Sequence, residues 1–199
     1  MRERCIFIKL NEDDFFIHEL NQFYHLCQKI INPNNRMNKS IFTLLLVLIV
    51  FASSAQDKAN IYNPNADAKA DLKNAIAKAK VENKHVLIQV GGNWCPWCVK
   101  FHKFATTDHK IDSLIKADYI FLLINYSKEN RNIEVLNSLQ NPGRFGYPVF
   151  VILDGNGKIL HTQDSGLLEL DKGYDPKKVY TFLKGWNVYA LDPKNYPSK

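Results

Sequence analysis

Residues 85–101 read HVLIQVGGNWCPWCVKF, and this stretch decides the fold. The apolar run at 85–90 is rich in Val and Ile, which is typical of a strand buried on both faces. Two glycines and an asparagine then break the strand, and Pro96 stands where the first turn of a helix tolerates proline. The sequence therefore predicts a strand, a turn and a helix, with Cys95 and Cys98 at the junction.

The position of the two cysteines suggests chemistry. A helix N-terminus presents unpaired N–H groups and about half a positive charge, which favours a thiolate on Cys95. We expect Cys95 to be the exposed nucleophile and Cys98, one turn deeper, to be the more buried resolving thiol. The alternative is an inert structural disulfide, but so small a loop gives little chain-entropy stabilisation. The pair is therefore interpreted as redox-active.

The rest of the chain predicts an α/β domain. An amphipathic helix at 66–82, capped by Asn65, precedes the first strand, and a helix capped by Asp108 follows the cysteine helix. Strands are expected at 119–124, 148–153 and 158–161, a weaker helix at 132–139, and a last helix after Asp175. Alternating strands and helices predict a central sheet covered on both faces, with an antiparallel pair at its edge.

Two motifs together resemble the thioredoxin-like superfamily: WCPWC at 94–98 and GYPVF at 146–150. The resemblance covers roughly residues 66–186 and is greatest to exported bacterial proteins of the thiol-disulfide interchange type. It implies a thioredoxin fold, which is a mixed four-stranded sheet with helices on both faces, here with an added N-terminal helix. It also implies dithiol-disulfide exchange without cofactor or metal, and a cis proline at Pro148 that faces the cysteines.

The catalytic candidates are therefore Cys95 and Cys98. Five further residues are candidates for binding the substrate: Trp94, Pro96, Trp97, Tyr147 and Pro148. Both tryptophans could instead be core aromatics, and Pro148 could be an ordinary trans proline of an edge strand. Two features depart from the family pattern. Gln89 stands where thioredoxins carry a buried acid, and Pro96-Trp97 lacks the histidine of the oxidising members, so reductase, oxidase and isomerase roles all stay open.

Two other functions compete with disulfide exchange. A copper(I)-binding module could use Cys95 and Cys98, with His102 as an optional third ligand. A closed zinc site would want four ligands, and covalent haem attachment would need histidine where Val99 stands. The second competitor is a non-catalytic binding module with incidental cysteines, which the flanking tryptophans and the downstream proline argue against.

The N-terminal region has the pattern of an export signal. Residues 37–55 combine a short positive start, a 12-residue apolar run at 41–52 and small residues before Gln56, which predicts cleavage after Ala55. The run is shorter than the roughly 20 residues of a membrane-spanning helix, and no cysteine follows it as a lipoprotein would require. We therefore expect a periplasmic or secreted protein that meets the membrane only through an uncleaved signal.

Residues 1–36 precede this signal as an extra segment, so Met37 is a second candidate initiator, and Cys5 and Cys27 would then lie outside the working protein. Residues 56–65 are expected to be an exposed lead-in and 187–199 a C-terminal tail. The net charge of +6 is diffuse, which disfavours a nucleic-acid partner. The expected partners are protein thiols or disulfides and a redox partner protein.

Overall fold

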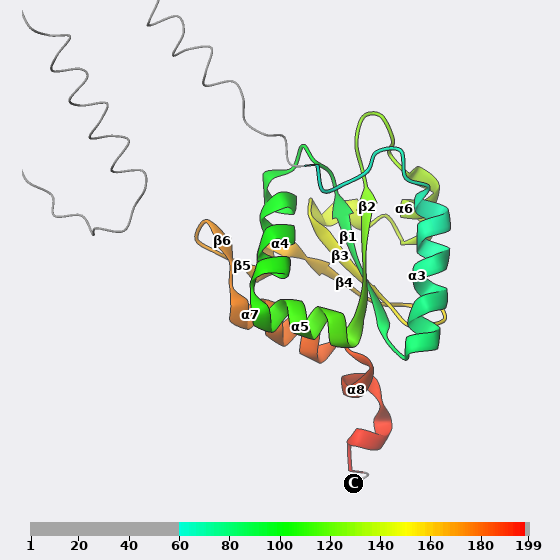
Figure 1. Ribbon diagram of the computed structural model, residues 1–199, viewed down its shortest axis with the longest axis vertical. Coiled ribbons are helices and arrows are strands. Elements are labelled where there is room, and N and C mark those ends of the chain that lie inside the picture. Colours follow the sequence, from blue (N-terminus) through cyan, green and yellow to red (C-terminus); the bar gives the residue numbers. More distant parts are fainter. Residues whose placement is uncertain (1–59, 198–199) are drawn as a thin grey trace, which may run out of the picture. The chain divides into compact units, whose positions relative to one another are not determined.

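The computed structural model describes residues 60–197, drawn in colour in Figure 1. Helices and strands alternate there as the apolar pattern predicts. In chain order the elements are α3 (Ala68–Glu82), β1 (His85–Gly91), α4 (Pro96–Thr107), α5 (His109–Asp118), β2 (Tyr119–Asn125), α6 (Ile133–Ser138), β3 (Val149–Leu153), β4 (Ile159–Asp164), β5 (Glu169–Leu170), β6 (Gly173–Tyr174), α7 (Pro176–Gly185) and α8 (Val188–Leu191).

The main sheet has four strands in the order β2-β1-β3-β4. β1 runs parallel to β2 and antiparallel to β3, and β4 is antiparallel to β3 at the edge. Every residue of β1 and β3 is buried, as their mainly apolar sequences predict. The expected mixed four-stranded sheet with an antiparallel edge pair is confirmed.

Helices cover both faces of this sheet (Figure 1). Leu87 of β1 packs in one cluster with side chains of α4, α5 and α7. Its neighbours Val86 and Ile88 pack in the other cluster, with α3 and α6. Because side chains along a strand alternate between faces, Gln89 shares the face of Leu87, on which the cysteine helix α4 lies.

Aspartates cap the helices. Asp108 and Asp175 each accept hydrogen bonds from the second and third backbone amides of α5 and α7, as the sequence suggests. For the first helix the predicted cap, Asn65, is wrong. Asp67 performs this role on α3, and the amide of Asn65 instead donates to the side chain of Asn63 in a turn.

A small hairpin lies between the sheet and the last helix, where no element was expected. The fourth strand continues past 161 to Asp164, and a 3-10 turn (Ser165–Leu168) leads into β5 and β6. Tyr174 of β6 packs edge-on against Phe101, with ring centroids 5.0 Å apart, and so fixes the hairpin to α4. The expected tail from 187 also begins with a packed residue, since Asn187 is 2% exposed and donates to Asp118.

The predictions for the N-terminal region lie outside the described residues. These are the extra segment at 1–36, the signal peptide at 37–55 with its cleavage after Ala55, and the roles of Cys5 and Cys27. Between residues 60 and 197, no helix has both the length and the apolar character needed to cross a membrane.

Candidate active site

Cys95 and Cys98 form a disulfide at the start of α4. Cys95 is the N-cap residue and Pro96 is the first residue of the helix, so the missing proline N–H leaves no partner unsatisfied. The backbone N–H of Cys98 points at Cys95 Sγ across 3.1 Å. A hydrogen-bond donor at this distance stabilises negative charge on sulfur, so the geometry favours a thiolate at Cys95 once the pair is reduced.

The two sulfurs are less accessible than the sequence suggests. Cys98 is fully buried, as predicted, but Cys95 is itself only 4% exposed. The prediction of an openly exposed nucleophile is therefore wrong. The reason is the packing of Trp97 and Tyr147 against the disulfide.

The second predicted motif lies beside the first. The peptide bond between Tyr147 and Pro148 is cis, as predicted, and Pro148 is buried. The carbonyl oxygen of Tyr147 lies 3.5 Å from Cys95 Sγ, where it can accept a hydrogen bond from the thiol after reduction. Burial, and then the electrostatic effect of the neighbouring Tyr126 hydroxyl, raise the pKa of Tyr147 to about 12, so this side chain stays uncharged at neutral pH.

The two tryptophans of the motif have different environments. Trp94 is 55% exposed, and its indole N–H donates to the carbonyl of Tyr126 across 2.6 Å. Trp97 is half-buried, with its ring edge-on to Tyr174 and the ammonium of Lys100 4.5 Å from its centroid. Trp94 thus offers more free apolar surface beside the sulfurs, while Trp97 mainly packs against the hairpin.

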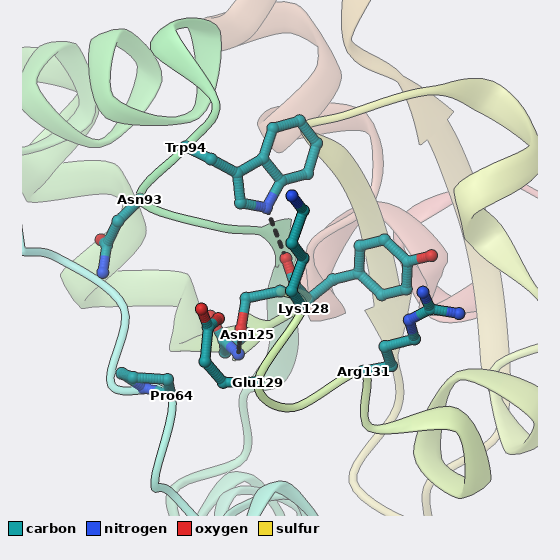
Figure 2. Close-up of a pocket in the computed structure, with 9 residues that line it drawn as sticks. Pro64, Asn93, Trp94, Asn125, Lys128, Glu129 and Arg131 are labelled. Atoms are coloured by element: carbon teal, nitrogen blue, oxygen red, sulfur yellow. Dashed lines mark hydrogen bonds between the residues drawn. The ribbon is translucent and has the colours of Figure 1, made fainter.

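Trp94 also forms one wall of a cavity of about 640 Å³ (Figure 2). The cavity lies between the chain before α3, the turn after β1 and the loop after β2. Its lining residues are Pro64, Asn93, Trp94, Asn125, Tyr126, Ser127, Lys128, Glu129 and Arg131. Sequence reasoning missed all of them except Trp94, because the residues after β2 form a polar loop without a motif.

The histidine considered as a metal ligand has another environment. His102 stacks on Phe121 with ring centroids 6.1 Å apart, and burial lowers its pKa, which favours the neutral form. Among residues 60–197, no three His, Cys, Asp or Glu side chains gather in an arrangement that could hold a metal ion.

Comparison with known proteins agrees with this geometry. Residues 67–155 match the model of the family described as thioredoxin-like. A solved disulphide isomerase from Xylella fastidiosa Temecula1 is 27% identical, with a TM-score of 0.57 over 63% of this chain and 95% of that one.

Together these two matches support a thioredoxin-like fold for the described part of the chain. A thioredoxin from Thermus thermophilus is 16% identical, with a TM-score of 0.44 over 64% of this chain and 94% of that one. A solved DsbH oxidoreductase is 18% identical, with a TM-score of 0.42 over 68% and 98%. No curated protein matches the chain.

Two uncharged polar side chains, those of Gln89 and Tyr62, lie behind the disulfide. Gln89 is fully buried, as its strand predicts, and its amide nitrogen donates to the carbonyl of Cys98 across 3.0 Å and to the hydroxyl of Tyr62 across 2.7 Å. Gln89 Oε1 has no hydrogen-bond partner within the described residues. Tyr62 belongs to the expected exposed lead-in but is 1% exposed, because its ring packs in one cluster with the two cysteines.

Proposed function

We propose that this protein is a thiol-disulfide oxidoreductase that exchanges disulfides with exported protein substrates through Cys95 and Cys98. The observation that carries the proposal is the cysteine pair at the start of α4, with the backbone nitrogen of Cys98 3.1 Å and the carbonyl oxygen of Tyr147 3.5 Å from Cys95 Sγ. A purely structural disulfide would not need a thiolate-stabilising donor beside one sulfur.

The reaction follows from this arrangement. The Cys95 thiolate attacks one sulfur of a substrate disulfide, a mixed disulfide forms, and the other substrate sulfur leaves with the electron pair as a thiolate. The Cys98 thiolate then attacks Cys95 Sγ, which releases the second substrate sulfur and closes the Cys95–Cys98 disulfide. The substrate gains two electrons and this protein loses two. A dithiol partner protein must return them, and in the oxidising direction all steps run in reverse.

The surface around Cys95 supports a polypeptide substrate. Cys95 is 4% exposed, and the rings of Trp94 and Tyr147, which pack edge to face with centroids 5.6 Å apart, offer apolar surface close to it. The cavity beside Trp94 offers apolar surface together with the charged side chains of Lys128, Glu129 and Arg131. An extended segment next to the substrate cysteine would fit there.

The test uses the full chain with Cys5 and Cys27 changed to serine, so that Cys95 and Cys98 are the remaining thiols. We expect this protein to exchange a peptide disulfide, Cys95→Ser to abolish exchange, and Cys98→Ser to accumulate the mixed disulfide. Disulfide exchange that persists in Cys95→Ser would refute the proposal. Stoichiometric copper without exchange would favour the metal-binding alternative.

Two further measurements define direction and location. Equilibration with glutathione buffers gives the reduction potential, which ranges in this class from about −270 mV for reducing thioredoxin to about −120 mV for strong oxidants. Export is part of the same proposal, and it predicts that the secreted chain begins at Gln56. A mature chain that retains residues 37–55 would contradict the cleavage.

A further inference from the structure

Tyr62 lies outside both sequence motifs but packs against the two cysteines. Its backbone is fixed at the active site by Asn93: the Tyr62 N–H donates to Asn93 Oδ1 across 2.9 Å, and Asn93 Nδ2 donates to the Tyr62 carbonyl across 2.8 Å. Its hydroxyl oxygen accepts the hydrogen bond from Gln89. The segment before α3 is thereby held against the cysteine turn at three points.

The Tyr62 hydroxyl and the Cys98 sulfur border the same small space. A Cβ added to Gly91 would lie 2.9 Å from Tyr62 Oη and 2.4 Å from Cys98 Sγ. Glycine at this position therefore lets both groups approach the end of β1 from the α4 side. No side chain of Gly91 stands between the phenol and the sulfur.

The hydroxyl hydrogen of Tyr62 is available. The oxygen of this hydroxyl accepts from Gln89, and among the described residues the hydroxyl donates no hydrogen bond in the oxidised protein. Burial raises the pKa of Tyr62 far above its usual value of 10, so the phenol keeps its proton at every physiological pH. It can give a hydrogen bond, but it cannot take up the thiol proton.

Cys98 needs such a donor when it is reduced. A fully buried sulfur forms a thiolate at a cost, because burial disfavours the charged form. The side chains that pack around the pair are Ile61, Tyr62, Trp97, Leu123 and Tyr147. The titratable side chains among them are the two tyrosines, and His102, one turn along α4 from Cys98, has its pKa lowered by burial.

We propose that the Tyr62 hydroxyl donates a hydrogen bond to the Cys98 thiolate during resolution of the mixed disulfide, with Gln89 as the positioning residue that orients it. This role rests on the proposed disulfide exchange. The Cys98 thiol first loses its proton to solvent base, and the thiolate then attacks Cys95 Sγ while the substrate sulfur leaves with the electron pair. Tyr62 keeps its proton throughout.

The test is the titration of Cys98 in the full chain carrying Cys95→Ser, Cys5→Ser and Cys27→Ser. The Cys98 Cβ chemical shift followed against pH reports its ionisation. We expect Tyr62→Phe to raise the midpoint by about one pH unit or more, a tenfold change in ionisation, because a hydrogen bond to a charged group is lost. In the chain that keeps Cys95, resolution of the mixed disulfide near neutral pH should slow by about threefold, because the higher pKa also makes the remaining thiolate a stronger nucleophile.

The matched control is Tyr119→Phe. Tyr119 is 2% exposed and its hydroxyl donates to the carbonyl of Leu183 on α7, so the variant also loses a buried hydroxyl but one remote from the site. Its Cys98 midpoint should not move. If Tyr62→Phe does not fold, Asn93→Ala decides the matter, because it removes the two bonds that hold the Tyr62 backbone and should raise the midpoint in the same direction.

An unchanged midpoint in the folded variant overturns the role of Tyr62, and so does an equal rise in Tyr119→Phe. The titration needs no substrate turnover, so it is independent of the proposed function. If Tyr62→Phe shifts the Cys98 midpoint but the protein exchanges no disulfide, the proposed function is refuted while the Tyr62–Cys98 hydrogen bond stands.

Discussion

Gly91→Ala adds one methyl group at the most crowded point behind the disulfide. The new Cβ would lie 2.4 Å from Cys98 Sγ and 3.3 Å from Cys98 Cβ, well inside the roughly 3.5–4.0 Å of an ordinary contact between heavy atoms. In the oxidised protein the sulfur cannot turn away, because it is bonded to Cys95. Tyr62 cannot retreat easily either, because Asn93 holds its backbone.

The two redox states should respond differently. Overpacking of this kind costs about 1–3 kcal/mol of unfolding free energy. The reduced Cys98 side chain can rotate about its Cα–Cβ bond and avoid part of this cost. If the oxidised form loses about 1.4 kcal/mol more than the reduced form, the reduction potential rises by about 30 mV, because the destabilised disulfide is easier to reduce.

The assay closes a thermodynamic cycle. Urea unfolding of the oxidised and the reduced protein gives the two losses in free energy, and glutathione equilibration gives the potential independently. Gly185→Ala is the matched control, since its added Cβ has no heavy atom within 4 Å and should leave the potential unchanged. Equal destabilisation of both forms, with an unchanged potential, would show that the methyl does not press on the bonded sulfur.

Alkaline pH should destabilise the protein. Burial raises the pKa of Tyr62 and of Tyr119 above the unfolded value near 10. The protonated phenols therefore contribute fully to the stability of the folded protein below pH 10. Above pH 10 this contribution is lost, by at most about 1.4 kcal/mol per pH unit for each group. Urea unfolding at pH 9 and pH 11 measures this, and Tyr62→Phe should flatten the slope. Trp94→Ala should raise KM for a peptide disulfide about fivefold, the value of a lost aromatic contact, with little change in stability because Trp94 is 55% exposed; an unaltered KM would remove it from substrate binding.

The elements that position the cysteines were predictable because each has a local signal. Mainly apolar runs predicted β1 and β3, which are buried on both faces. Asp108 and Asp175 each cap a helix, and apolar residues recur at helical spacing in the sequence that follows each of them. The cysteine helix has proline at its first position, and because helices tolerate proline in the first turn, the sequence alone locates the helix start.

The hairpin of β5 and β6 has no such signal. Two-residue strands are too short to show an alternating pattern, and their pairing depends on the turn that joins them. The hairpin is held instead by tertiary contacts. Tyr174 packs against Phe101 and its hydroxyl donates to the carbonyl of Trp97, both on α4. Trp97 is half-buried because this hairpin packs against it, and the residues next to Trp97 in the sequence do not predict that contact.

Tyr62 was missed for a related reason. It is one aromatic residue in a polar segment, and no pattern distinguishes it from an exposed tyrosine. Its burial depends on Asn93, which lies 31 residues later and bonds to both of its backbone groups. The family resemblance placed Gln89 beside the cysteines, but neither the resemblance nor the residues pointed to Tyr62 as its partner.

The Gln89–Tyr62 pair changes how the resolving cysteine can be activated. A buried carboxylate at position 89 could accept the thiol proton and become neutral, but whenever it kept its negative charge it would disfavour a thiolate nearby. Gln89 and Tyr62 stay neutral, and Gln89 holds the Tyr62 hydroxyl, whose hydrogen is free to donate. This hydroxyl can stabilise the thiolate without repelling it, although neither side chain can remove the thiol proton. Solvent then removes the thiol proton, and Tyr62 stabilises the thiolate that results. Because no protein side chain acts as the base, the pH dependence of resolution should follow the ionisation of Cys98 itself.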